Sequence, residues 1–257
     1  FGSPEKPEVF FQFREACRGI ADACRAFGTP VTGGNVSFYN ESPTGAIDPT
    51  PTIGMVGLLE RAEHRVPSFF GRAGDDVLIL GATRGELGGS AYWAEIRGFV
   101  GGAAPRVDLD AERGLQDFLV ETAAQGLLRS AHDTSEGGLL VALAEAAIGG
   151  PYAAGPIGAK LDLEGYAPAA ELEGLLFGED AGRVVASADP AHSDVLAELA
   201  RRHRVPFFRA GRTGGPRLEL RAGSGVFSWV LESLRRTYFE AIPRRMQHAD
   251  AERSVGE

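Results

Sequence analysis

Three glycine-containing polar loops have the composition of a site that handles anions and divalent cations. The first runs from Val31 to Ser37 and reads VTGGNVS. Two adjacent glycines let backbone N–H groups approach an anion closely, and Asn35 with the nearby hydroxyls can complete a phosphate or Mg²⁺ shell. It is not a Walker loop, because no Gly-Lys-Ser/Thr follows, and it lacks the Gly-x-Gly-x-x-Gly of a Rossmann fingerprint. The alternative is a tight turn with Asn35 in the left-handed conformation.

The second loop, LGGS at 87–90, opens a predicted helix. Small residues at a helix N-terminus suit an anion. Ser90 acting as a plain N-cap explains the same residues at least as well. A further polar pair, Glu179 and Asp180, precedes a predicted strand, and paired acids in a turn are expected to be solvated.

The third loop reads AHDTSEGGL at 131–139 and also precedes a predicted helix. Asp133 and Glu136 could hold Mg²⁺ through carboxylate oxygens, and His132 could act as a base. Alternatively, Thr134 or Ser135 caps the helix while the acids complement its dipole. The residues alone leave both interpretations open.

Hydrophobic periodicity places these loops between alternating strands and helices. Apolar residues at three-to-four spacing predict a helix over 8–27, ended by Gly28 and Pro30. Strands are predicted at 53–60, 76–81, 106–109, 157–163, 183–188, 207–212 and 216–221, and helices at 90–97, 110–129, 139–148, 190–203 and 226–240. Residues 61–75 mix charge, proline and glycine without a period, which predicts a domain boundary. The alternation indicates an α/β, or layered α+β, fold.

Composition excludes several functional classes. The chain has 257 residues and a formal net charge of -9, with no basic stripe for nucleic acid. No apolar run approaches the ~18 residues of a membrane span, and no secretory signal is visible, so we expect a cytoplasmic protein. Cys17 and Cys24 lie seven apart on one predicted helix, too far for a disulfide, and are predicted to be buried core thiols. Glycine, at 35 residues, is about twice its usual share.

Four ordered motifs resemble one family of enzymes. The first motif spans 5–42 and 49–60 and contains TPVTGGNVSFYNES followed by PTPTIGMVGLLE. The other three follow in order: LGGSAYWAEIRG, AHDTSEGGLLVALAEAA and LFGEDAGRVVAS. Together with the terminal LRRTYFEAIPRRM, they resemble the synthetase subunit of phosphoribosylformylglycinamidine synthase, in the AIR synthase superfamily. The resemblance covers essentially the whole chain. It implies a partial N-type domain followed by a C-type domain. Residues 1–62 would be the remainder of the N-type domain, residues 63–223 the C-type domain, and residues 224–257 a terminal helix and tail.

The resemblance also implies roles for residues of the first loop. Gly34 would bind ATP, Asn35 would bind Mg²⁺ and Ser37 would contact the substrate, formylglycinamide ribonucleotide. The family's catalytic histidines and most Mg²⁺-binding acids belong to a first half that this chain would lack, so no catalytic residue is expected here and the chain alone is expected to be inactive. His132 and Asp133 would lie at a pseudo-symmetric second nucleotide site. Ala181 replaces a family glutamine, so no substrate is expected at 179–181.

The implied reaction is an ATP-dependent amidation in purine assembly. ATP phosphorylates an amide oxygen of the substrate, and ammonia displaces the phosphate to give the amidine. The implied partners are a glutaminase subunit, which delivers the ammonia, and a small bridging subunit. Two alternatives remain: a non-catalytic nucleotide-binding scaffold, and another AIR synthase superfamily enzyme. One such enzyme would be a selenophosphate synthetase-like kinase, which would want a catalytic Cys or Sec and a Lys near its N-terminus.

Overall fold

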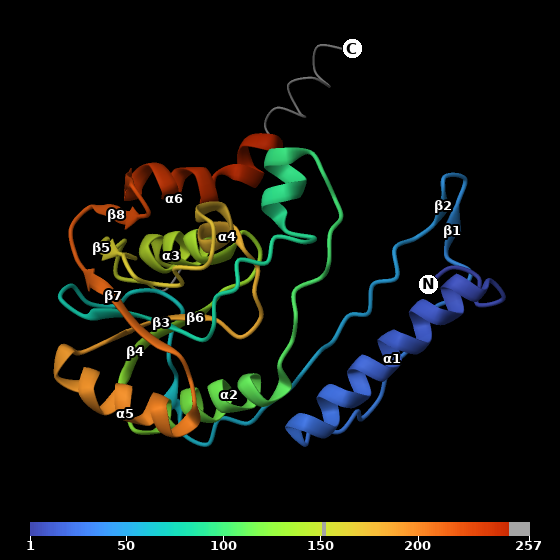
Figure 1. Cartoon of the computed structure of the whole chain (residues 1–257), viewed down its shortest axis with the longest axis horizontal. Helices are drawn as coiled ribbons and strands as arrows, with labels where there is room; N and C mark the ends of the chain where they lie inside the picture. Colours follow the sequence, from blue (N-terminus) through green and yellow to red (C-terminus); the bar gives the residue numbers. More distant parts are fainter. Residues whose placement is uncertain (151–152, 247–257) are drawn as a thin grey trace, which may run out of the picture. The chain divides into compact units, whose positions relative to one another are not determined.

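The computed structural model describes residues 1–150 and 153–246, and the chain divides into two units, Phe1–Glu60 and Arg61–Glu257. The second contains a seven-stranded sheet with helices on both faces (Figure 1). This confirms the predicted layered α/β class. No helix of the described residues is long and apolar enough to cross a membrane.

The sheet of the second unit is mixed, with strand order β4-β6-β3-β7-β5-β8-β9. Every adjacent pair is antiparallel except β5 and β8, which are parallel. The strands are β3 (Asp76–Leu80), β4 (Leu128–Asp133), β5 (Ala159–Asp162), β6 (Val184–Ala188), β7 (Phe207–Thr213), β8 (Arg217–Ala222) and β9 (Gly225–Val230).

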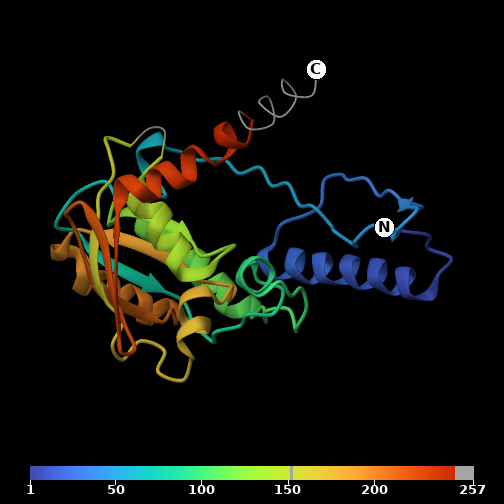
Figure 2. The same ribbon diagram turned by 90° about the horizontal axis from the view of Figure 1, so that it is seen from above.

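Two apolar cores form because successive side chains of a strand point to opposite faces. In the fully buried strand β3, Val77 and Ile79 face one core while Leu78 and Leu80 face the other. The first core includes helices α3 (Gly138–Ile148), α4 (Leu172–Phe177) and α6 (Leu231–Phe239); the second includes α2 (Leu109–Ala124) and α5 (Ser193–His203). The sheet thus lies between two helical layers (Figures 1 and 2).

The first unit consists of one long helix and a chain with little regular structure. Helix α1 (Pro7–Phe27) ends at Gly28, whose φ of 65° is left-handed, as the sequence predicts. A short hairpin follows, β1 (Glu41–Ser42) with β2 (Gly45–Ala46). Val9 is the one buried residue of α1. Cys17 is exposed and Cys24 is half-buried, so the prediction of two buried core thiols is wrong.

The strand predicted at 53–60 is not formed. These residues have no regular secondary structure, and Val56 and Leu58 are 103% and 92% exposed. A strand needs a hydrogen-bonded neighbour, and no segment of the described chain pairs with this one. The apolar pattern alone therefore predicted a strand that does not form.

Four other predicted elements differ from the structure. The strand predicted at 106–109 is absent, because the Asp108 carboxylate accepts hydrogen bonds from the N–H groups of Asp110 and Ala111 and starts α2 there. Helix α2 ends at Ala124, before a left-handed Gly126, so that 128–133 form β4 rather than helix and loop. The helix predicted over 226–240 begins only at Leu231, after β9. The segment predicted as helix at 90–97 contains a π-helix, Tyr92–Ile96.

Candidate functional site

The double glycine of the first loop is not required by the fold of its own unit. Neither Gly33 nor Gly34 has a positive φ, and a Cβ built on either would meet nothing within 4 Å. Both residues are exposed. The missing side chains therefore leave open space beside the backbone, which is what close approach of a ligand needs.

Asn35 and Ser37 lie side by side in the same loop. The Asn35 Nδ2 donates to Ser37 Oγ at 3.4 Å, and both residues are exposed. The Asn35 Oδ1 accepts no hydrogen bond within the described part of the chain, so it is available as a neutral oxygen ligand for a hard cation. The loop thus offers open backbone, one amide oxygen and one hydroxyl.

The first residues of the chain hold the end of this loop in place. The Phe1 nitrogen donates to Ser37 O at 3.0 Å, and the Tyr39 N–H donates to Gly2 O at 3.0 Å. A Cβ on Gly2 would lie 2.8 Å from the Ala46 Cβ, so this close approach requires glycine.

Side chains strengthen the same connection. The Phe38 ring packs edge-on against Phe13 of α1, with the centroids 5.0 Å apart. Lys6 Nζ pairs with Glu41 Oε1 at 2.8 Å, and this pair holds the pKa of Glu41 below its usual value. The loop end is therefore anchored to α1 and to the first six residues.

The second loop is built into the other unit as a structural turn. A Cβ on Gly88 would overlap the Ala103 carbonyl, and Gly89 has a φ of 71°. Ser90 is 1% exposed, and its Oγ accepts from the Trp93 N–H at 3.3 Å. These contacts favour the capping role of Ser90 over an open anion site.

The third loop is divided between a strand and a helix start. His132 and Asp133 end β4, where His132 Nε2 lies 3.3 Å from Glu145 Oε2 of α3. Gly137, with a φ of 79°, precedes α3, and neither Thr134 nor Ser135 gives it a side-chain cap. Ser135 Oγ donates to Asp133 Oδ2 instead. The side-chain cap, one of the two interpretations that the sequence left open, is therefore not formed.

A single carboxylate joins the second and third loops. Glu179 Oε1 accepts from the Ala91 N–H at 2.9 Å and from the Gly137 N–H at 2.8 Å. These N–H groups lie where an anion would bind at the starts of the π-helix and of α3. The protein's own side chain therefore occupies the anion position of both loops.

The expectation that Glu179 and Asp180 are solvated is wrong. Asp180 is 0% exposed and accepts three backbone N–H groups, those of Arg84, Gly85 and Glu86, at 3.0–3.1 Å. The buried Arg183 guanidinium lies 3.7 Å away and donates to Gly178 O. Burial lowers the pKa of Arg183. The acids hold the long loop after β3 rather than meeting solvent, which adjacency in a turn could not reveal.

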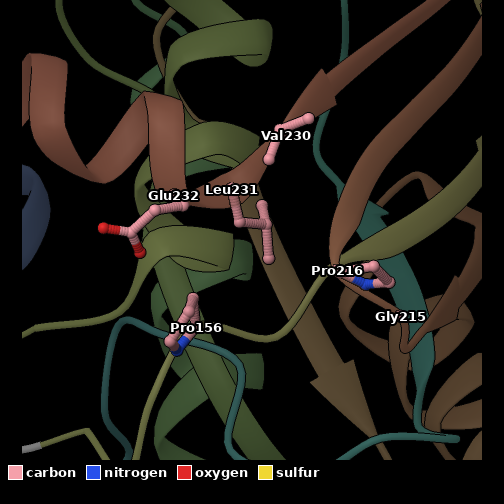
Figure 3. Close-up of a pocket in the computed structure, with 6 residues that line it drawn as sticks. All are labelled: Pro156, Gly215, Pro216, Val230, Leu231 and Glu232. Atoms are coloured by element: carbon pink, nitrogen blue, oxygen red, sulfur yellow. The ribbon is translucent and has the colours of Figure 1, made fainter.

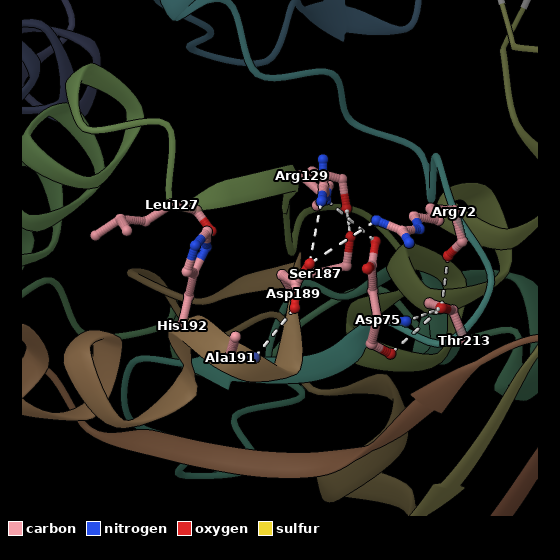
Figure 4. Close-up of polar contacts among 10 residues, drawn as sticks. Arg72, Asp75, Leu127, Arg129, Ser187, Asp189, Ala191, His192 and Thr213 are labelled. Atoms are coloured by element: carbon pink, nitrogen blue, oxygen red, sulfur yellow. Dashed lines mark hydrogen bonds and ion pairs between the residues drawn. The ribbon is translucent and has the colours of Figure 1, made fainter.

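Two further features of this unit have polar or hollow surroundings. At one end of β3, Asp75 is 2% exposed, its Oδ2 lies 3.9 Å from Arg129 Nε, and burial raises its pKa (Figure 4). Arg129 and Arg72 both also pair with Asp189. These groups neutralise one another around the strand ends. No three His, Cys, Asp or Glu side chains of the described chain gather as a metal site.

The other feature is a hollow of about 310 Å³ between strand ends and the start of α6 (Figure 3). It is lined by Pro156, Gly215, Pro216, Val230, Leu231 and Glu232. The lining offers one carboxylate and no nucleophile. The hollow lies outside all three glycine loops, so the first loop remains the candidate site.

Comparison with known proteins decides the family. A family model described as AIR synthase related protein, C-terminal domain, matches residues 72–222, and the corresponding N-terminal domain matches residues 1–59. The chain belongs to the AIR synthase related proteins. The predicted order, an N-type segment followed by a C-type domain, is confirmed.

This AIR synthase related chain is similar in sequence to a named synthase subunit. It is 47% identical over 244 residues to phosphoribosylformylglycinamidine synthase subunit PurL of Thermobifida fusca, covering 95% of this chain and 31% of that protein. The chain thus spans about a third of the length of the relative, and the resemblance found in its motifs is confirmed.

Two solved structures share the fold at 21% identity, both of Thermotoga maritima PurL. The complex with FGAR has a TM-score of 0.68 and covers 84% of this chain and 36% of that one. The complex with ATP has a TM-score of 0.62, with 85% and 34% covered.

Proposed function

We propose that this chain is part of an ATP-dependent ligase that converts formylglycinamide ribonucleotide and ammonia to formylglycinamidine ribonucleotide. The 47% identity to a synthase subunit over 95% of the chain carries the proposal. The T. maritima relatives that share its fold were solved with ATP and with FGAR. Such identity over nearly the whole chain favours the same chemistry, to which this chain contributes one wall of a site.

The first loop supplies the residues for this role. The open backbone at Gly34 would accept ATP, and Ser37 would hydrogen-bond to the ribonucleotide. Asn35 Oδ1, which has no hydrogen-bond donor within the described residues, fits as a ligand for Mg²⁺. A bound Mg²⁺ would neutralise charge on the transferring phosphoryl group. Mg²⁺ is commonly held by few protein ligands together with substrate phosphates and water, and a single amide oxygen suits that mode.

The residues of this chain would bind and orient rather than exchange protons. The anchoring of 37–41 by residues 1–6 fixes the hydroxyl of Ser37 relative to Asn35, and a preorganised pair loses less entropy on binding. We also propose a glutaminase subunit as the ammonia source, a small bridging subunit, and a cytoplasmic location where ATP is supplied. The divisions 1–62, 63–223 and 224–257 remain proposed domain limits.

The test compares two loops in the complete synthase polypeptide, with ammonia as the nitrogen donor. We expect Asn35→Ala to lower amidine formation at least about tenfold and to raise the Mg²⁺ concentration required, because a metal ligand is lost. Asn35→Asp, which keeps an oxygen ligand, should retain more activity.

Asp133→Asn is the matched comparison and should leave the rate nearly unchanged. Calorimetric titration with Mg²⁺-ATP gives a second readout. Binding lost in Asp133→Asn but kept in Asn35→Ala would contradict the proposal and favour a nucleotide-binding scaffold centred on the third loop.

A further inference from the structure

Tyr39 has a backbone conformation that its residue type disfavours. Its φ is 57°, and only Ala167 and Arg204 share a positive φ among the non-glycine residues described. A bulky residue adopts the left-handed region rarely, since its Cβ crowds the backbone. Residues held in this way occur at ligand sites, where the surrounding structure imposes the conformation.

Hydrogen bonds on both sides of Tyr39 impose this conformation. Its own N–H donates to Gly2 O at 3.0 Å, and the next N–H, of Asn40, donates to Phe1 O at 3.1 Å. Asn40 O in turn accepts from the Ile47 N–H at 3.1 Å. The backbone is thus fixed by its neighbours.

No side-chain contact within the described residues compensates for this unfavourable backbone conformation of Tyr39. It is 63% exposed, its hydroxyl forms no hydrogen bond, and its ring stacks on no other ring within the described residues. Phe38, the preceding residue, behaves in the opposite way, because its ring packs against Phe1 and Phe13. The Phe38 ring therefore packs against α1, whereas the Tyr39 phenol has no hydrogen-bond or ring partner within the described residues.

Tyr39 follows the proposed substrate residue, Ser37, by two positions in the chain. Two residues of chain span at most about 7 Å, so Ser37 and Tyr39 can contact one small ligand together. Ser37 is exposed, as Tyr39 is. A tyrosine hydroxyl donates one hydrogen bond, and a charged acceptor gives the stronger one.

We propose that Tyr39 is a further substrate-contacting residue, whose hydroxyl donates a hydrogen bond to the phosphate group of the ribonucleotide bound at Ser37. This rests on the proposed function. The left-handed backbone aims the phenol, and the phosphate provides the acceptor that the protein does not.

The test measures steady-state kinetics of the complete synthase polypeptide with ammonia as donor. Tyr39→Phe removes only the hydroxyl and should raise KM for the ribonucleotide about tenfold, as expected for one hydrogen bond to a charged group. KM for ATP and the unfolding temperature should not change. Tyr39→Gly should raise the same KM without lowering the unfolding temperature, because glycine tolerates the left-handed backbone. Tyr238→Phe, at an exposed tyrosine of α6, is the control and should change nothing.

A substrate lacking the phosphate gives the decisive comparison. Wild type and Tyr39→Phe should bind the dephosphorylated riboside equally, since the acceptor is gone. If Ser37→Ala raises KM for the ribonucleotide while Tyr39→Phe leaves it within about twofold, the inference is overturned and the proposed function stands. If neither variant changes KM, the substrate site at this loop is itself overturned. A lower unfolding temperature in Tyr39→Gly would assign Tyr39 a structural role and overturn the inference.

Discussion

At the scale of single residues, Gly34 and Gly138 show two different reasons for glycine beside polar side chains. Gly138 has a φ of 71°, and a Cβ there would lie 2.6 Å from the Phe177 carbonyl carbon. Gly34 has neither constraint. The folded chain therefore needs glycine at 138, whereas any need for glycine at 34 comes from what binds there.

Alanine at these two positions should separate stability from ligand binding. Gly138→Ala should destabilise the fold by at least about 1–3 kcal/mol, because it combines left-handed strain with a backbone clash. Gly34→Ala should leave stability unchanged and weaken Mg²⁺-ATP binding. Urea unfolding and calorimetric titration of both variants check this. A large loss of stability in Gly34→Ala would contradict the ligand-based explanation.

At the scale of elements, a charged contact joins α2 to α5. Arg202 Nη2 donates to both carboxylate oxygens of Glu121, and His203 Nε2 lies 2.7 Å from Oε2. These hydrogen bonds, from Arg202 first and then His203, lower the pKa of Glu121 to about 2. The ionised carboxylate is therefore favoured in the folded state.

The sign of the resulting pH dependence follows from that direction. A carboxyl whose pKa is lower when folded stabilises the fold above its unfolded value, 4.5, and this contribution is lost as the pH falls toward about 2. We expect Glu121→Gln to reduce the urea midpoint at pH 6 and to converge with wild type near pH 2. Glu136→Gln, at an exposed carboxylate, is the control. A difference that persists at pH 2 would show that the effect is not ionic.

Sequence reasoning found the elements whose signals are local. The 8–27 helix pattern with Gly28, the apolar run of β3 and the helix after Gly137 all appear in the structure close to their predicted bounds. It failed where distant contacts decide. Residues 53–60 lack a pairing neighbour, and Asp180 is buried by N–H groups about 95 residues away in sequence. The left-handed Tyr39 has no signature in its residue type, so sequence reasoning could not single it out.

At the scale of the whole molecule, the two units differ in how they are stabilised. Residues 61–246 enclose two apolar cores around a sheet, whereas Val9 is the one buried apolar residue among residues 1–60. The connecting residues 53–60 are exposed and without regular structure. Protection against unfolding should therefore be concentrated in the second unit.

Brief trypsin treatment of the purified chain tests this difference. Cleavage should occur first at Arg61, next to the exposed segment, and yield a resistant fragment beginning at Ala62. Arg97 and Arg106 are the internal comparison, since both lie in the long loop whose start Asp180 holds. Mass spectrometry of the first products identifies the order, and initial cleavage at Arg97 would contradict the expected rigidity of that loop.

The carboxylate of Glu179 also acts as a competitor for any dissolved anion that approaches the second and third loops. Because it is attached to the chain, it competes for the Ala91 and Gly137 N–H groups at an effective concentration of about millimolar or above. A dissolved phosphate at lower concentration loses that competition by mass action. Two of the three glycine doublets are thus closed to free anions by a tethered competitor. Within the described residues no carboxylate accepts a hydrogen bond from the first doublet, where we propose that nucleotide binds.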